Sequence, residues 1–430
     1  MHRCKQFAIT LGLLAAPLAR ASAQGAPAPG MLLLTRRQAV DSALANNPQL
    51  RVATTQIAQA RARVTEATAF PDPTLSADYG GLTSPTAFGS NTGSDVGVGL
   101  TVPFLTKFRL RDIVSSADLH SAQFNLVQLQ QQTASQTVQA YDALLVAERH
   151  HADLLQTDSL AADFFHKTQV RYQNGAAARL DVIKAQVDLS QVENDLIANE
   201  RERANARAGL NRLMGRMLGS AIDAADSLAV PADLPQLDAL TLAAHDARPE
   251  LRAAAGQRRG ASASTSLARE FWLPDLSLGV TKNTAQGTAS SYTTGIGFTV
   301  PLFFWNHSRG EVAEARWHER ELEASYRDLE AQVDLDVRTT YATASTALRQ
   351  AAFLRDQVLP EAREAYRIAS VSYGLGGSSA LDVLDARRTL VDAQNQFAEA
   401  LGAANDARAD LERAVGTPLD APALGGSHDR

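Results

Sequence analysis

The sequence is short of cysteine, of aromatic residues and of positive charge. It has one cysteine in 430 residues, and aromatic side chains make up 6% of the chain. A single cysteine excludes a disulfide-stapled scaffold, and an apolar content of 45% excludes a wholly disordered chain. Lys and Arg number 41 against 47 Asp and Glu, a net charge of −6. The chain therefore lacks the positive surplus that binding to nucleic-acid phosphates requires.

The sequence also has no apolar run long enough to span a membrane as a helix, and its longest apolar run lies at the N-terminus. Two basic residues precede the apolar run Phe7–Leu18, and Ala21-Ser22-Ala23 then supplies the small residues of a cleavage site, which is the pattern of a secretory signal peptide. The run falls short of the roughly 20 residues that span a bilayer as a helix. We expect residues 1–23 to be a signal peptide, and Cys4 to be removed with it, which leaves a mature chain without thiols.

The residue patterns of the common enzyme classes are also missing. No G-x-x-x-x-G-K-[ST], G-x-S-x-G or H-E-x-x-H occurs, so the residues for nucleotide hydrolysis and common hydrolase reactions are not there. His150 and His151 are adjacent and face different sides of a helix, and the i, i+4 spacing of a helical metal site is not found at His166, His307 and His318. We expect no enzyme, no cofactor and no metal site.

What the sequence does contain is a repeat. Matching segments lie 201 residues apart: Asn47–Arg51 and Arg248–Arg252, Tyr172 and Tyr373, and Leu180–Val182 and Leu381–Val383. Around Val102 and Val300 the offset falls to 198, and it recovers before Tyr373. Insertions and deletions that cancel within a fixed period are typical of a duplicated unit with variable loops.

Each copy begins with the same order of elements. A helical stretch comes first, opened in the first copy by Thr35 and Gln38 at the spacing of a capping box. Two segments of period-two alternation follow, at about 73–103 and again at about 274–303, and predict β-hairpins. Each strand is about ten residues long, the length that crosses a bilayer at a tilt, although one such hairpin alone is more typical of a soluble protein.

A long helical tract follows each hairpin. Apolar positions recur at steps of three and four from Ile113 to Leu145, which predicts a coiled coil. Turns at Asn174-Gly175 and at Gly374–Gly377 then reverse the chain, because glycine supplies the left-handed backbone that ends a helix. Each copy therefore ends in an antiparallel helical hairpin, at about 109–214 and at about 308–415.

Four strands of membrane length cannot close on themselves. An open sheet edge is intolerable in lipid, so several chains must contribute strands to one barrel. Two chains would give eight strands and a filled interior, whereas three would give twelve strands and a lumen. The helical hairpins would then pack side by side into a second tube.

The helical turns carry a resemblance to a known family. Tyr172-x-x-Gly175 before Leu180-Asp181-Val182, repeated as Tyr373-x-x-Gly376 before Leu381–Ala386, resembles the TolC-like outer membrane efflux proteins. The resemblance spans the chain from Leu34 to about Pro418. It implies a mainly α protein with a small β part, which forms a homotrimer with a 12-stranded barrel in the outer-membrane lipid and an α-helical barrel in the periplasm.

The same resemblance implies a function and partners. The function is that of a passive exit duct in a tripartite efflux system, which also contains a periplasmic adaptor and an inner-membrane pump of the resistance-nodulation-division type. The segments Lys107–Arg111 and Pro301–Gly310 look most like the heavy-metal branch, which implies metal cations as cargo. Ducts for drug efflux or for type I protein secretion remain alternatives, as does a secreted periplasmic coiled-coil structural protein.

The expected domains follow the repeat. They are a signal peptide at 1–23, an N-terminal segment at 24–34, a first structural repeat at 35–235, a second structural repeat at 236–418 and a C-terminal tail at 419–430.

Three aspartates stand just after the helical turns. Asp382 and Asp385 match the paired pore aspartates of the family, and Asp181 occupies the corresponding place in the first copy. In a trimer such carboxylates would form rings that favour cations. Capping of a helix by Asp382, with Asp385 complementing its first turn, is the alternative and is compatible with a pore role.

The resemblance also assigns the residues around those aspartates. Tyr373 matches a tyrosine that latches the closed tip against the neighbouring coil. Some members have an arginine in that latch where this chain has Ser378, while the first copy has Arg179, so pairing of Arg179 with an aspartate is one possible substitute. The residues expected at the helical tips that contact the adaptor are Tyr172, Gly175, Arg179, Gly376 and Ser378.

Overall fold

The computed structural model describes residues 32–79, 93–285, 289–299 and 304–419. The expected signal peptide, residues 301–303 and nearly all of the expected C-terminal tail lie outside the described residues. The first described element is β1 (Leu32–Leu34), which precedes the repeats. The elements of the first repeat are α1 (Arg36–Asn46), α2 (Pro48–Thr68), β2 (Thr74–Tyr79), β3 (Gly93–Val102), α3 (Leu105–Gln173), α4 (Arg179–Leu213) and β4 (Ile222–Ala224). Those of the second are α5 (Leu237–Ala247), α6 (Pro249–Arg269), the 3-10 turn η1 (Glu270–Trp272), β5 (Asp275–Ala285), β6 (Ser291–Thr299), α7 (Phe304–Phe353), the π-helical segment η2 (Leu354–Val358), α8 (Leu359–Leu375) and α9 (Ala380–Val415).

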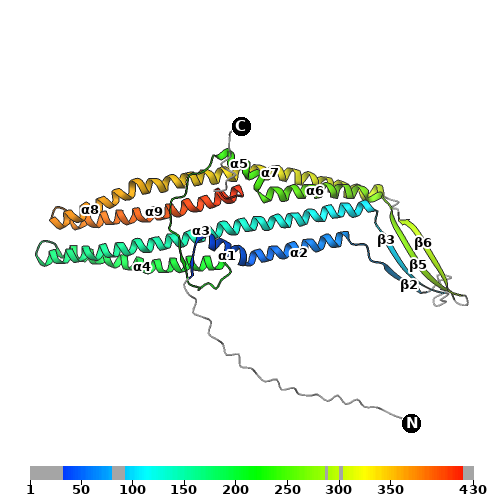
Figure 1. The fold of residues 1–430 in the computed structure, drawn as a ribbon, viewed down its shortest axis with the longest axis horizontal. Coiled ribbons are helices and arrows are strands. Elements are labelled where there is room, and N and C mark those ends of the chain that lie inside the picture. The colour runs from blue at the N-terminus through cyan, green and yellow to red at the C-terminus, as the bar shows by residue number, and fades with distance from the viewer. Residues whose placement is uncertain (1–31, 80–92, 286–288, 300–303, 420–430) are drawn as a thin grey trace, which may run out of the picture.

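The helices run side by side along one axis, with the sheet at one end (Figure 1). At the opposite end lie the turn between α3 and α4 and the turn between α8 and α9, which are called here the first tip and the second tip. The short pair β1 and β4 lies midway, at a level called here the equator. The mainly α architecture with duplicated helical hairpins is as the sequence predicted.

The sheet has four antiparallel strands in the order β2, β3, β5, β6. Its central pairing joins the two repeats, with Leu100 of β3 opposite Leu278 of β5. Among the described strands, β2 and β6 each have one neighbour, so both outer edges are open. The sheet projects beyond the helices instead of folding back onto them (Figure 1), and its apolar side chains are exposed, among them Leu75, Val96, Val98, Val280, Ile296 and Phe298.

Proline and capping residues divide the N-terminal helices. The Thr35 N–H donates to Gln38 Oε1 at 3.0 Å, and the Gln38 N–H donates to Thr35 Oγ1 at 3.3 Å, so the capping box that the sequence predicted opens α1. Asn47 ends α1 and caps α2 by accepting the Gln49 N–H at 2.8 Å. Pro48 then stands in the first turn, where a missing N–H costs nothing.

The long arms of the two repeats differ in continuity. α3 is an unbroken helix of 69 residues, whereas its counterpart is α7 and α8 joined by η2. Pro360 stands just after η2 and has no N–H to donate to the carbonyl four residues earlier, which is a common cause of such a break. A π turn also holds more residues than an α turn, so η2 takes up part of the length that the second repeat recovers before Tyr373.

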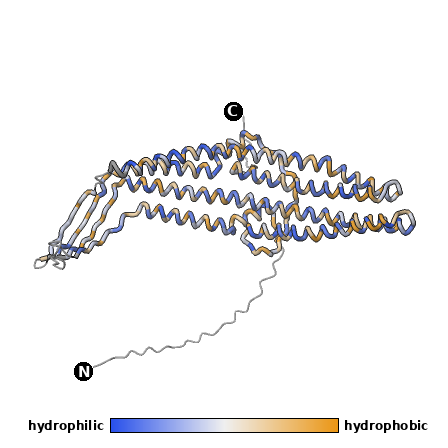
Figure 2. The backbone as a smooth tube through the Cα atoms, turned by 180° about the vertical axis from the view of Figure 1, so that it is seen from behind, coloured by the Kyte–Doolittle hydropathy of each residue, from blue (hydrophilic) through white to orange (hydrophobic). Residues whose placement is uncertain are grey.

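Packing between the arms relies on small residues. The buried hydrophobic residues of α9 are largely alanines, with Leu401, Leu411 and Val415 between them, so neighbouring helices approach closely. Apolar and polar residues are interleaved along the long helices (Figure 2). Among the described residues, no helix is long and apolar enough to cross a membrane.

A buried polar cluster ties the repeats together at the equator. Asp142 of α3 is fully buried and forms an ion pair with Arg36, whose backbone N–H donates to Asp226 Oδ2 at 2.7 Å. Arg36 also donates to Asn405 of α9 at 3.3 Å. Burial raises the pKa of Asp142 to about 6, although Arg36 opposes the shift. Burial also raises the pKa of Asp406 to about 7, and the charge of Asp142 adds to that shift.

Candidate functional site

The two tips end their first helix in the same way. Gly175 has φ 71° and Gly376 has φ 85°, the left-handed conformation that glycine adopts without strain. Each turn closes with the same two backbone hydrogen bonds. In the first tip the Ala176 N–H donates to the Arg171 carbonyl at 2.8 Å and the Gly175 N–H to the Tyr172 carbonyl at 2.9 Å. In the second tip the Gly377 N–H donates to the Ser372 carbonyl at 2.8 Å and the Gly376 N–H to the Tyr373 carbonyl at 3.1 Å. This is the Schellman motif, so backbone geometry explains a glycine at both positions.

The tips differ in how the next helix begins. In the second tip, Ser379 Oγ accepts the Asp382 N–H at 3.3 Å while Asp382 accepts the Ser379 N–H at 2.8 Å, a complete capping box. In the first tip, Asp181 accepts the Ala178 N–H at 3.3 Å, but the alanine side chain has no oxygen, and the Asp181 N–H donates to the Ala178 carbonyl at 3.0 Å instead. The hydrogen bond from the Ser379 backbone lowers the pKa of Asp382, since it favours the charged carboxylate.

The predicted acidic residues gather at this end of the molecule. Asp382 and Asp385 are exposed and lie one turn apart at the start of α9, and Asp181 is half-buried at the start of α4. The helix cap itself is Ser379, and Asp382 is the third residue of the helix, so the capping role of Asp382 is reciprocal. This bonding leaves Asp382 at the surface and ionised.

Tyr373 is a buried contact between the two helical hairpins. Its side chain is 3% exposed, and its ring lies 5.3 Å from the ring of Phe164 on α3. The Tyr373 hydroxyl donates to Thr168 Oγ1 at 3.3 Å. The guanidinium of Arg171 lies 4.6 Å above the Tyr373 ring and donates to the Tyr373 carbonyl. We call these four residues, which join α3 to α8, the tip clasp.

Arg171 was not among the residues that the sequence analysis singled out. It also donates to the Ala176 carbonyl at 3.3 Å, so it contacts both tips. One signal was present, because a basic residue in the last turn of a helix can bond its terminal carbonyls. Its contact with Tyr373, 202 residues away, could not be read from a single sequence.

The remaining predicted tip residues make fewer contacts. Tyr172 is 44% exposed, and Arg179 is exposed at the first residue of α4. Within the described residues of the single chain Arg179 forms no ion pair, and its pairing with an aspartate stays a prediction. Ser378 donates to the Ala369 carbonyl at 3.0 Å, a bond inside its own hairpin.

A second link between the hairpins lies farther from the tips. Arg387 of α9 forms an ion pair with Asp188 of α4, and the Arg387 side chain is 8% exposed. Burial lowers the pKa of Arg387 from its ordinary value. A buried pair of this kind is costly to break from one side, because an unpaired charge then remains in a poorly hydrated place.

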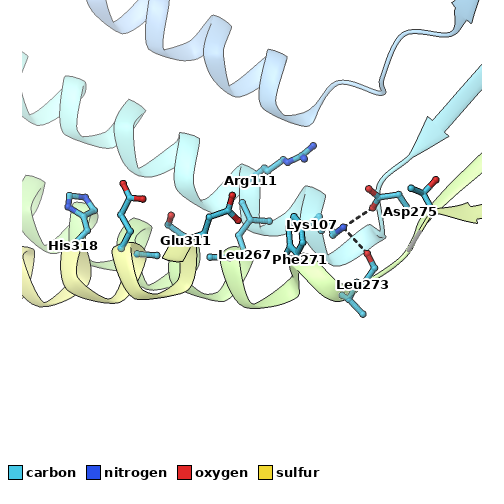
Figure 3. Close-up of a pocket in the computed structure, with 13 residues that line it drawn as sticks. Lys107, Arg111, Leu267, Phe271, Leu273, Asp275, Glu311 and His318 are labelled. Atoms are coloured by element: carbon cyan, nitrogen blue, oxygen red, sulfur yellow. Dashed lines mark hydrogen bonds and ion pairs between the residues drawn. The ribbon is translucent and has the colours of Figure 1, made fainter. Parts of the chain in front are cut away.

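The other end of the helices contains a cavity of about 660 Å³ beside the sheet. Lys107 donates there to Asp275 at 2.8 Å and to the Leu273 carbonyl at 2.9 Å (Figure 3). Glu311 and His318 line the same cavity from α7 (Figure 3). In the described part of the chain, no group of three or more His, Cys, Asp or Glu side chains is placed to hold a metal ion.

Known proteins resemble the chain over most of its length. The family described as outer membrane efflux protein matches residues 39–216 and again 241–417. The cobalt-zinc-cadmium resistance protein CzcC of Cupriavidus metallidurans is 22% identical over 385 residues, which cover 89% of this chain and 90% of CzcC.

Solved structures share the fold. The Campylobacter jejuni CmeC outer membrane channel matches with a TM-score of 0.75 at 18% identity, over 96% of each chain. CusC matches with a TM-score of 0.75 at 19% identity, over 90% of this chain and 93% of that one. Both matches cover 90% or more of this chain, so its overall fold recurs in these channels.

Proposed function

The chain belongs to the outer membrane efflux protein family, whose members are outer-membrane channels that extend into the periplasm. We propose that three copies of it form the exit duct of a tripartite efflux system. A periplasmic adaptor and an inner-membrane pump of the resistance-nodulation-division type would be the partners. The observation that carries the proposal is the sheet, whose apolar side chains are exposed and whose described outer strands each have one neighbour. Such a sheet is stable in lipid only when other chains close it.

The internal repeat supports a specific pairing between subunits. β2 corresponds to β5 and β6 corresponds to β3, so the seam between β6 of one subunit and β2 of the next should copy the pairing of β3 with β5. Leu100 pairs with Leu278 within the chain. At the repeat offsets of 198 and 201, the matching pair between subunits is Phe298 opposite Ala77 of the adjacent copy.

Cysteine cross-linking tests both the oligomer and this register. We expect the double variant Ala77→Cys with Phe298→Cys to form disulfide-linked trimers in outer membranes, because directly opposed strand residues lie within disulfide range. The matched control is Ala77→Cys with Ile296→Cys, which is two residues out of register and should link poorly. Monomers from both variants would contradict the closed barrel, and equal linking would contradict the register.

At the other end, the proposal assigns a gate to the tips. The tip clasp would hold the two hairpins of a subunit together in the closed state, while the exposed Asp382 and Asp385 would face the narrow pore and favour cations. Tyr172, Arg179 and Ser378, with the turn glycines Gly175 and Gly376, would meet the adaptor. Support comes from the exposure of Tyr172 and Arg179 at the end of the helices.

Conductance in planar bilayers separates these assignments. Asp382→Ala with Asp385→Ala should weaken block by multivalent cations, whereas the exposed Asp41→Ala at the equatorial helix α1 should not. Arg171→Ala should raise the open fraction, because the clasp loses its cation–π contact and its bond to the Tyr373 carbonyl. If block by multivalent cations is unchanged in the double aspartate variant, Asp382 and Asp385 only stabilise the start of α9.

For the cargo, we propose divalent metal cations. The relative with 90% of its length matched is named for resistance to cobalt, zinc and cadmium, and the acidic tips suit cations. A deletion strain should become sensitive to one or more of these metals and recover when the gene is restored. Sensitivity to organic drugs alone would favour the alternative of a drug-efflux duct.

A further inference from the structure

A groove rich in arginine lies between α6 and α7. Its volume is about 770 Å³, and five guanidinium groups line it: Arg258, Arg259, Arg269, Arg316 and Arg320. We call it the arginine groove. Its Arg269 end lies toward the sheet, because α6 ends at Arg269 and β5 begins six residues later, whereas Arg259 lies about 15 Å farther back along α6 (Figure 1).

The positive charges in the groove are not balanced. Glu323 forms an ion pair with Arg258, and Glu319 accepts a hydrogen bond from Thr265 at 3.0 Å. In the part of the chain that the structure describes, no carboxylate forms an ion pair with Arg259, Arg269 or Arg316. Like charges held close together repel, so this surplus favours an anion in the groove. The surplus is also out of step with a chain whose net charge is −6.

The cavity beside the sheet, which Lys107 and Asp275 line, has no comparable surplus of positive charge. On the side of α6 that faces α3, Lys107 is paired with Asp275, and two glutamates of α7 accompany Arg111 (Figure 3). Basic and acidic groups are therefore mixed there. The arginine groove lies against the same two helices, α6 and α7, but concentrates one sign of charge.

The first repeat supplies an internal control. At the offsets that align the repeats, the five arginines correspond to residues without positive charge: Ile57, Ala58, Thr68, Asp118 and Ala122. In the first repeat, α2 and α3 take the places of α6 and α7 beside the β-hairpin, and they do so without arginine at these five positions. The repeated fold therefore does not require the charges of Arg259, Arg269 and Arg316, which favours a binding role for these three.

Two exposed tryptophans lie beside the groove, Trp272 and Trp317. Trp272 is 59% exposed and stands between α6 and β5. Trp317 is 65% exposed, and the guanidinium of Arg320 lies 4.7 Å above its ring. Tryptophan is enriched where the headgroups of a bilayer meet water. Arginine offers a planar, bidentate fork that matches the oxygens of a phosphate.

We propose that the arginine groove binds the phosphate of an anionic phospholipid headgroup in the leaflet that surrounds the periplasmic end of the sheet. Arg259, Arg269 and Arg316 supply guanidinium groups that form no ion pair with any residue the structure describes, and Arg320 lies over the exposed ring of Trp317. This inference goes beyond the gate and the cargo. It uses only the membrane location of the sheet, and the channel could conduct with the groove empty.

Native mass spectrometry of the delipidated protein in detergent tests the groove. The probes are a short-chain phosphatidylglycerol, a short-chain phosphatidylcholine and inorganic phosphate. The variant Arg259→Gln with Arg269→Gln and Arg316→Gln removes three charges that hold no ion pair, so folding should survive. The matched control is Arg51→Gln with Arg61→Gln and Arg63→Gln, three exposed arginines of the corresponding helix α2.

We expect wild type and control to bind phosphatidylglycerol more tightly than phosphatidylcholine, and the groove variant to bind it roughly 100-fold more weakly, since each basic residue near an anionic headgroup contributes about fivefold. Equal binding by variant and control overturns the proposal. Saturable binding of inorganic phosphate without lipid preference overturns the lipid assignment. Loss of the oligomer in the groove variant alone overturns it as well, because the arginines would then contact another subunit. Conductance of the same variant shows whether the channel itself is intact.

Discussion

The first and second tips share one backbone turn but use it differently. Both contain a glycine in the left-handed conformation and the same two backbone hydrogen bonds from N–H groups to carbonyl oxygens. Tyr172 and Tyr373 occupy the same place before that glycine, yet Tyr172 is exposed and Tyr373 is buried against Phe164 and Arg171. Duplication has therefore preserved what the turn geometry requires, while the side chains have specialised. The second tip is held by the first hairpin, whereas the tyrosine of the first tip is left at the surface.

The two tyrosines provide the strongest test of that difference. Tyr373→Ala removes a buried ring and should destabilise the protein by about 3 kcal/mol or more, whereas Tyr172→Ala should cost less than about 0.5 kcal/mol. Thermal unfolding measures both changes, and hydrogen exchange should locate the loss at α8. Tyr373→Phe keeps the ring and gives up only the bond to Thr168, so it should cost about 1 kcal/mol. Similar losses in the two alanine variants would mean that the tips are equivalent.

The comparison of repeats extends to the equator, where the first contributes the fully buried Asp142 and the second the half-buried Asp406. The pKa values of Asp142, about 6, and Asp406, about 7, exceed the ordinary value near 4, so the folded chain binds more protons than the unfolded chain between about pH 4 and 7. The free energy of unfolding should therefore increase as the pH falls from 8 to 5. The contribution of these two carboxyl groups should be lost as the pH rises through 7.

Replacing one carboxyl group isolates its share of this effect. Asp406→Asn should stabilise the protein by about 2 kcal/mol at pH 8 and change it little at pH 5, because the variant no longer buries a charge. Unfolding temperatures at the two pH values give the difference. Asp41→Asn, at an exposed position of α1, serves as the control and should leave the pH dependence as it is. A parallel response of both variants would show that the equatorial cluster does not titrate in this range.

Glycine substitution tests the shared part of the design. Gly175→Ala and Gly376→Ala should each cost about 1 kcal/mol, because both force a side chain into the left-handed region. No atom blocks a Cβ at Gly175, and the nearest atom to one at Gly376 is the end of the Arg171 side chain at 3.8 Å. The two costs, measured by thermal unfolding, should therefore agree. A much larger loss at one glycine would show that the turns are not equivalent.

Exchanging the capping residues should give an effect as small as that of the glycines but more specific to one helix. Ser379→Ala should cost about 1 kcal/mol, since α9 loses the oxygen that accepts the Asp382 N–H. Ala178→Ser should stabilise α4 by up to the same amount, because Asp181 already supplies the other half of the box. Hydrogen exchange in the first turns of α4 and α9 reports each change separately. No protection gained in the Ala178→Ser variant would mean that the first tip cannot adopt the complete box.

Much of the fold could be predicted because its signals are local. The capping box of Thr35, the break at Pro48 and the glycine turns each depend on residues within one helical turn, and the repeat confirmed the order of elements. Period-two alternation likewise predicted the sheet. These features need no knowledge of which helices touch.

The tip clasp and the equatorial cluster could not be predicted in the same way. Arg171 and Tyr373 lie 202 residues apart, and Arg36 meets Asn405 across 369 residues. A sequence pattern also gives no reason to expect Asp142 to be fully buried, because charged side chains usually lie at the surface. The π-helical segment η2 could not be predicted either, because a single proline can end a helix, kink it or stand in its first turn.

The pairing of β3 with β5 has a consequence for the order of folding. β3 ends at Val102 and β5 begins at Asp275, so the centre of the sheet must wait until the whole first hairpin and two further helices have been made. Helices form in microseconds from neighbouring residues, whereas strands so distant in sequence meet slowly. The helical arms would thus form before the apolar surface of the sheet is complete.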